Sequence, residues 1–343
     1  MAGGWLGNLS AGNLTNLMIR QIRSIFLLVR FPNLVIIAAT QYAMRYLIME
    51  PLLPAREFEL QFGDLQFFLL VLSTVFIAAA GYIINDYFDT QADMINKPAR
   101  VVVGVEIGRR IAMILHAMLN IIGVGIGIYL GFYVGLPALS LVFLLATGLL
   151  WFYSTNYKRQ FLVGNLSVSF LTGLVPLLAV LFEIPLLNRV YGQEMLLHSV
   201  NFNYIFAWVG GFSFFAFLTT LIRELIKDAE DFEGDAAYGM KTLPIVLGTM
   251  WTRIIVVILI FFTLFTLIYL LLKFIFFSVE PADYFSLTYF VLLLLIPLVL
   301  LALRVLTAKN KRNYHTASTL IKLIMLTGIG YSGMVFYLVI FKY

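Results

Sequence analysis

Carboxylates gather at two places in this sequence. Half of the 18 Asp and Glu residues fall in two short polar segments, 86–93 and 224–235. The first segment spaces its aspartates at i, i+3 and i+7, which places them on one face of a helix: Asp86, Asp89 and Asp93. The second segment repeats that spacing, with Glu224 one turn earlier: Asp228, Asp231 and Asp235. We therefore predict two similar half-sites.

Three carboxylates on one helix face repel one another, and the repulsion costs more at a membrane boundary. A divalent cation removes that cost. Oxygen-only ligands favour Mg²⁺, which usually binds one or two carboxylates together with substrate phosphates. All six aspartates are therefore candidate Mg²⁺ ligands, and the catalytic candidates among them are Asp86, Asp89, Asp231 and Asp235. Two alternatives stay open: helix-capping acids in a solvated loop, and the cation site of a transporter.

A diphosphate held between two such clusters is a good leaving group. If the carbon that carries it is allylic, ionisation gives a delocalised carbocation, and the metal stabilises the charge that develops on the diphosphate. The chain also supplies 31 Phe and 18 Tyr residues, whose ring faces stabilise a cation and whose bulk excludes water. Nearby cations are candidates for the remaining phosphate charge: Lys97, Arg100, Lys158 and Arg159.

The elements that position these acids are predicted to be transmembrane helices. The chain is 62% hydrophobic and 12% charged, which excludes an ordinary soluble protein. We predict an all-α polytopic membrane protein with one transmembrane domain, 25–343, after an N-terminal cytoplasmic or interfacial segment, 1–24. Nine apolar runs are long enough to cross the membrane as helices, and none alternates as a barrel strand would: roughly 25–48, 65–86, 110–131, 133–153, 162–183, 203–225, 252–275, 285–305 and 317–340.

The distribution of positive charge predicts the orientation. All but five of the 23 Lys and Arg residues fall on alternate connections, which the positive-inside rule assigns to the cytoplasm. This places the N-terminus and both acidic segments inside and the C-terminus outside, in the inner membrane if the source is bacterial. The net charge of +5 then reflects contacts with membrane lipids, so no nucleic-acid partner is expected. The absence of Cys excludes disulfides and thiolate chemistry.

At the acidic residues the sequence resembles the UbiA superfamily of intramembrane prenyltransferases. The family's first motif, NDxxDxxxD, is matched by Asn85, Asp86, Asp89 and Asp93. Its second motif is matched by Asp231 and Asp235, with Asp228 before them. The resemblance implies nine transmembrane helices around a central cavity, with both motifs at its cytoplasmic side. It also implies Mg²⁺ that holds a prenyl diphosphate, with Asn85 as a ligand or an orienting group.

The family carries a Tyr/Lys element, commonly YxxxK, between the fourth and fifth spans. Here the segment reads FYSTNYKRQ, in which Tyr153 stands one residue farther from Lys158 than that spacing, and Tyr157 adjoins Lys158. The resemblance implies that Lys158 contacts the diphosphate, with Tyr153 as the second candidate of this element. Asn165, which follows the loop, is a further candidate for the cavity.

The residues around the motifs resemble one branch of the family, the geranylgeranylglycerol-phosphate geranylgeranyltransferases that make a diether lipid precursor. The runs NDYFDxxxDxxNKPxR and RELIKDAEDFEGD carry this similarity. It implies a geranylgeranyl diphosphate donor, a lipophilic acceptor with a phosphate, and cations that bind this phosphate: Lys97, Arg100, Arg223 and Lys241. An aromatic acceptor such as 4-hydroxybenzoate or a naphthoate stays open, as does a cation-coupled transporter.

Overall fold

Helices make up almost the whole of this chain. The computed structural model describes residues 11–53, 58–96, 101–198, 201–276 and 283–341. Within these ranges the only β feature is an isolated bridge between Val103 and Ile107. This confirms the all-α prediction. Long, uniformly apolar runs form helices in lipid because a helix satisfies all their backbone groups within one segment.

The elements follow one another along the chain in this order: α1 (Ala11–Leu28), α2 (Phe31–Ala43), η1 (Met44–Met49), α3 (Glu50–Leu52), α4 (Asp64–Asn96), α5 (Arg109–Tyr133), η4 (Pro137–Leu139), α6 (Ser140–Thr155), η5 (Tyr157–Arg159), α7 (Val163–His198), α8 (Asn203–Glu230), α9 (Phe232–Ala237), α10 (Leu243–Leu271), η6 (Leu272–Phe276), α11 (Tyr284–Tyr289), η7 (Phe290–Leu295), α12 (Ile296–Thr307) and α13 (Lys311–Phe341).

Eight of the described helical segments are long and apolar enough to cross a membrane. A ninth is formed if the bent pair Gln21–Leu28 and Phe31–Leu52, whose axes differ by 54°, counts as one span. The protein is therefore a multi-pass integral membrane protein, and its eight to nine spans agree with the nine predicted from hydropathy.

The first span is bent, whereas the sequence predicted one continuous run. Arg30 lies at the break with φ 51° and ψ 52°, a left-handed conformation that a non-glycine residue rarely adopts. Pro32 follows in the first turn of α2. A proline is accommodated there, whereas inside a continuous helix its ring would clash with the preceding turn. The Arg30 side chain consequently leaves the helix at an angle that a straight helix would not allow.

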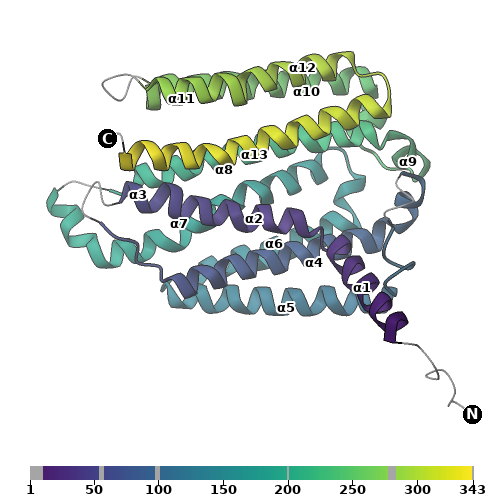
Figure 1. Cartoon of the computed structure of the whole chain (residues 1–343), viewed down its shortest axis with the longest axis horizontal. Helices are drawn as coiled ribbons and strands as arrows, with labels where there is room; N and C mark the ends of the chain where they lie inside the picture. The colour runs from purple at the N-terminus through teal and green to yellow at the C-terminus, as the bar shows by residue number, and fades with distance from the viewer. Residues whose placement is uncertain (1–10, 54–57, 97–100, 199–200, 277–282, 342–343) are drawn as a thin grey trace, which may run out of the picture.

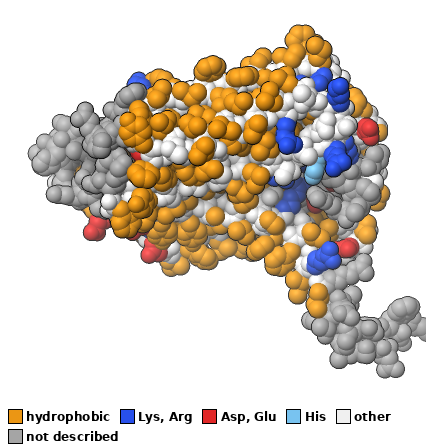
Figure 2. Space-filling view, turned by 45° about the horizontal axis from the view of Figure 1, so that its top comes forward, with side chains coloured by type: hydrophobic (Ala, Val, Ile, Leu, Met, Phe, Trp, Pro, Cys, Tyr) orange, Lys and Arg blue, Asp and Glu red, His pale blue; other side chains and the backbone are white. Residues whose placement is uncertain are grey.

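The helices pack side by side, with α9 at one end of the bundle and α3 at the other (Figure 1). α4 packs against α5, α7 packs against α8, and α13 lies against α8. Figure 2 shows hydrophobic side chains over the middle of the visible face, with Lys and Arg gathered toward one end. This is the pattern of a lipid-facing belt that ends in a charged interface.

The end opposite α9 is closed by a buried ion pair. Arg45 is 3% exposed and Glu183 is fully buried. The Arg45 NH1 atom lies 3.3 Å from Glu183 Oε2, and Glu183 Oε1 accepts hydrogen bonds from the backbone N–H groups of Gln61 and Phe62. The pair thus fixes the segment before α4 against α7.

Candidate active site

The first acidic motif lies on the last turns of α4, which runs without a break to Asn96. This confirms that Asp86, Asp89 and Asp93 lie on one helix. The carboxylate of Asp86 accepts a 2.8 Å bond from the Arg30 guanidinium. That guanidinium also stands over the Tyr82 ring, 4.9 Å from its centroid. The bend before α2 therefore delivers a cation to the first aspartate of the motif.

The second aspartate of the motif forms an ion pair with Lys158. Lys158 lies in η5, the short turn between α6 and α7, and the pair is largely shielded, with 8% of the lysine side chain and 16% of the aspartate side chain exposed. Gly164 allows this turn to approach α7, because a Cβ atom there would lie 2.8 Å from the Lys158 Cα. The close approach explains how a loop lysine reaches α4.

The second acidic motif is divided between two helices. α8 ends at Glu230, Asp231 has φ −93° and ψ 10°, and α9 begins at Phe232. The prediction that Asp228, Asp231 and Asp235 lie on one continuous helix face is therefore wrong. Aspartate is favoured at helix ends, because its short side chain hydrogen-bonds to nearby backbone groups in non-helical conformations. Asp228 accepts a 2.8 Å hydrogen bond from the Asn165 side chain, and Asp235 is buried.

Tyr153 of α6 lies near charged residues of both motifs. Asp89 of the first motif and Asp228 and Glu224 of α8 are close enough for their charges to act on its hydroxyl group. α9 also packs against α4. Segments separated by about 140 positions in the sequence thus meet at one end of the bundle, the end where Figure 1 shows α9.

Two further cations belong to loops that are joined through the backbone. The backbone N–H of Lys241 donates a 2.9 Å bond to the carbonyl of Arg159, and both side chains are exposed. Arg223 forms an ion pair with its neighbour Glu224. Arg159 therefore adjoins Lys158 in η5, Lys241 is joined to the same turn and Arg223 is paired on α8, while Lys97 and Arg100 lie outside the described residues.

The donor set fits a metal that arrives with its substrate. The Asn85 side-chain oxygen is buried and accepts no hydrogen bond, so it remains available as a ligand. In the part of the chain that the structure describes, no three Asp, Glu or His side chains are grouped to hold a metal by themselves. Mg²⁺ needs only one or two protein carboxylates when phosphate oxygens and water complete its coordination. Asn85 with the adjacent Asp86 and Asp89 meets that requirement.

Sequence reasoning missed the role of Arg30, which was counted only among the cations that set orientation. The signal was the order Arg30-Phe31-Pro32 inside an apolar run, since proline marks a helix break and a break redirects the side chain before it. Asn165 was a candidate for the cavity, and the structure places it on Asp228.

Comparison with known proteins places the chain in a family. The model of the UbiA prenyltransferase family matches residues 56–334. The digeranylgeranylglyceryl phosphate synthase of Methanothermobacter thermautotrophicus is 36% identical over 54% of this chain and 58% of its own length. That of Korarchaeum cryptofilum is 30% identical over 78% of this chain and 84% of its own length. The chain therefore spans little more than half of the length of the first of these relatives.

Solved structures share the fold. One described as a digeranylgeranylglyceryl phosphate synthase superposes with a TM-score of 0.59 at 22% identity, over 92% of this chain and 99% of its own. A UbiA homologue from Archaeoglobus fulgidus, bound to GPP and Mg²⁺, gives 0.55 at 15% identity, over 91% of this chain and 99% of its own. Because the family model covers most of the sequence and the fold agrees, the chain belongs to the UbiA prenyltransferase family and is one of its enzymes.

Proposed function

We propose that this enzyme transfers a geranylgeranyl group from geranylgeranyl diphosphate to geranylgeranylglyceryl phosphate in a Mg²⁺-dependent reaction. One observation carries the proposal: both acidic motifs meet around Tyr153, with Arg30 and Lys158 already paired to Asp86 and Asp89. The choice of donor and acceptor is supported by the relatives named digeranylgeranylglyceryl phosphate synthase.

The paired cations are the groups that receive the diphosphate. In this structure Arg30 and Lys158 form ion pairs with the carboxylates of Asp86 and Asp89, respectively. A diphosphate that enters with Mg²⁺ offers the cations phosphate oxygens and frees the carboxylates as metal ligands. Each charge-assisted bond from a cation to a carboxylate is replaced by one to a phosphate oxygen, so the exchange leaves no buried charge unpaired. The remaining ligands are drawn from Asn85, Asp93, Asp228, Asp231 and Asp235.

The reaction breaks one bond and forms another. When bound, Mg²⁺ neutralises the charge that develops on the leaving diphosphate. The allylic C1–O bond breaks with its electron pair on the diphosphate, and the hydroxyl oxygen of the acceptor then bonds to C1 and releases its proton. We assign Tyr153 the stabilisation of the cation between these steps, because aromatic faces attract positive charge.

Further cations bind the phosphate group of the acceptor. We assign it to Arg159, which adjoins Lys158, to Lys241, which is bonded to the same turn, and to Arg223 of α8; Lys97 and Arg100 belong to the same proposal through their sequence positions. In the orientation that we propose, the N-terminus and this end of the bundle face the cytoplasm and the C-terminus lies outside. The soluble diphosphate is then released on the cytoplasmic side.

An extraction assay tests the function. Purified protein in detergent receives Mg²⁺ and radiolabelled geranylgeranyl diphosphate, with geranylgeranylglyceryl phosphate, 4-hydroxybenzoate or a naphthoate as the acceptor. The expected product is a diether lipid that requires Mg²⁺ and disappears on addition of EDTA. Label in an aromatic product alone would overturn the acceptor, and an undiminished rate in EDTA would overturn the metal.

A further inference from the structure

A groove runs between α12 and α13, and no residue of the acidic motifs lines it. Its volume is about 420 Å³. Four residues of each helix line it, at the same i, i+3, i+4, i+7 spacing: Leu300, Leu303, Arg304 and Thr307 from α12, and Thr316, Thr319, Leu320 and Leu323 from α13. Each helix therefore offers one continuous stripe to the groove.

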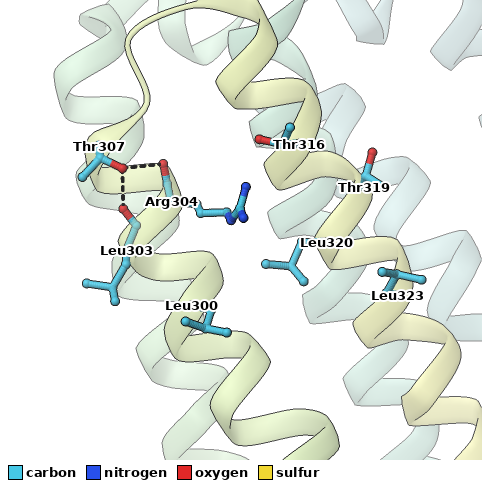
Figure 3. A pocket seen from close by; sticks show the side chains of 8 residues that line it. All are labelled: Leu300, Leu303, Arg304, Thr307, Thr316, Thr319, Leu320 and Leu323. Carbon is cyan, nitrogen blue, oxygen red and sulfur yellow. Dashed lines mark hydrogen bonds between the residues drawn. The ribbon is translucent and has the colours of Figure 1, made fainter.

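The groove changes from polar to apolar along its length. Arg304 and the three threonines lie toward the connection between the helices, and the leucines extend away from it (Figure 3). Figure 3 shows the Arg304 side chain reaching from α12 toward α13, while Leu320 points back toward α12. A charged mouth followed by an apolar channel has the same order of chemistry as a phospholipid, which carries a polar headgroup on a hydrocarbon chain.

Arg304 is the hydrogen-bond donor of the groove. The three threonine hydroxyls donate to carbonyl groups of their own helices: Thr307 to Leu303 at 2.9 Å, Thr316 to Asn313 at 2.8 Å and Thr319 to His315 at 3.0 Å. Among the described residues, the Arg304 guanidinium pairs with no carboxylate. Its planar donors match the oxygens of a phosphate group.

The two helices that line the groove carry basic side chains and no Asp or Glu. From Tyr284 to the C-terminal residue the sequence contains no Asp or Glu. The connection between the helices adds three exposed cations at the mouth: Lys309, Lys311 and Arg312. Basic pockets between transmembrane helices, at the level of the headgroups, attract anionic lipids.

We infer that this groove binds one anionic phospholipid of the bilayer, with the headgroup phosphate on Arg304 and an acyl chain along Leu303, Leu320 and Leu323. The lipid bridges α12 and α13 at the end of the bundle that also carries the active site. There His315 of α13 contacts Glu230, the last residue of α8, at 2.9 Å. The bound lipid thus braces the outer helix hairpin without touching the reacting groups.

Native mass spectrometry of the purified protein tests this binding. Delipidated protein is titrated with phosphatidylglycerol or with zwitterionic phosphatidylcholine of the same acyl chains. We expect one tightly held phosphatidylglycerol and an affinity about fivefold or more above that for phosphatidylcholine, because both lipids carry a phosphate but the choline cation cancels its charge beside Arg304 and the basic connection. Equal affinity for the two lipids would overturn the proposal.

Two matched pairs of variants locate the site. Arg304→Gln removes the cation in the groove, whereas Lys273→Gln removes an equal charge from an exposed position of η6 outside the groove. Leu323→Trp fills the groove, whereas Leu326→Trp adds the same bulk on an exposed face of α13 outside it. The first member of each pair should lose the preference for phosphatidylglycerol and the second should keep it. Equal losses within either pair would show general surface binding and would refute the groove.

Prenyl-transfer activity gives a folding check for all four variants, because none of these residues belongs to the catalytic or binding machinery. A variant that has lost the lipid but retains transfer activity is folded, so its loss of lipid reports the groove itself. A variant inactive in both assays is replaced by its milder partner, Arg304→Lys or Leu323→Phe. The lysine should restore part of the preference, and an arginine-to-lysine exchange without any effect would contradict planar phosphate recognition.

Discussion

Two aspartates of the first motif, Asp86 and Asp89, have a named partner, so their pairs can be tested one by one. Asp89→Asn keeps the volume of the side chain and removes the charge that pairs with Lys158. Transfer should fall by at least about 100-fold, the scale of losing one group that stabilises transition-state charge. Turnover at saturating substrate measures the effect.

The matched control for this change is Glu233→Gln. Glu233 lies in the second acidic segment, and its side chain is exposed. It loses the same charge at the same end of the bundle, so activity should stay within about twofold of the wild type, as for ordinary surface positions. A similar loss in both variants would point to bulk charge and would contradict a specific ligand role.

Arg30 is expected to act on donor binding. Arg30→Gln deletes the contact with Asp86 and the proposed contact with the diphosphate. The KM for the prenyl diphosphate should rise about tenfold or more, because a hydrogen bond to a charged group is worth roughly 1.5–3 kcal/mol. Arg23→Gln removes an exposed cation from α1 and serves as the control. An unchanged KM in Arg30→Gln would remove this residue from the site.

Among elements, the turn that carries Lys158 depends on one glycine. Gly164→Ala places a Cβ atom 2.8 Å from the Lys158 Cα and 3.0 Å from the Tyr157 carbonyl oxygen, so the turn has to move. Because displacement of a positioned group by about 1 Å can cost about 100-fold, kcat/KM should fall between about 10- and 100-fold. Steady-state kinetics with varied donor concentration measure the change.

Gly148→Ala is the control for that substitution. Gly148 lies within α6, and a Cβ atom there meets nothing within 4 Å. Alanine should leave activity unchanged and raise stability by up to about 1 kcal/mol, because it favours the helix over glycine. Equal activity of the two variants would show that the packing of this turn does not position Lys158.

The long helices could be predicted from the sequence, but their interruptions could not. Apolar length alone predicts the membrane span Asp64–Gln91, whereas the break at Asp231 depends on local competition between helix and turn. The partners of the aspartates were harder still. Arg30 and Asp86 are 56 positions apart, and only tertiary packing brings them together. Spacing finds residues on one helix and carries no information about which other helix meets them.

At the scale of the whole molecule, the two ends of the bundle have different roles. The end opposite α9 contains the buried pair Arg45–Glu183. Arg45→Met leaves Glu183 buried without its cation and should cost about 3–5 kcal/mol, seen as a lower melting temperature in detergent. Lys273→Met, at an exposed position of η6, should melt close to the wild type. Adding Glu183→Gln to Arg45→Met removes the unpaired charge and keeps an oxygen for the backbone N–H groups of Gln61 and Phe62, so it should recover most of the loss; a double variant less stable than the single one would contradict this account.

The orientation of the whole molecule can be read directly, because the chain contains no cysteine. Lys309→Cys lies at the same end as the active site, and Gln193→Cys lies near the opposite end of α7; both positions are exposed. In intact cells, an impermeant maleimide should label Gln193→Cys only. Labelling of Lys309→Cys instead would invert the proposed orientation.

The backbone bond from Lys241 to Arg159 has a consequence for building hybrid enzymes. The connections 156–162 and 238–242 come from different parts of the gene, yet each fixes the path of the other. A donor loop grafted alone would meet a foreign partner at this bond. In chimaeras between family members, these two connections should be exchanged together as a single cassette.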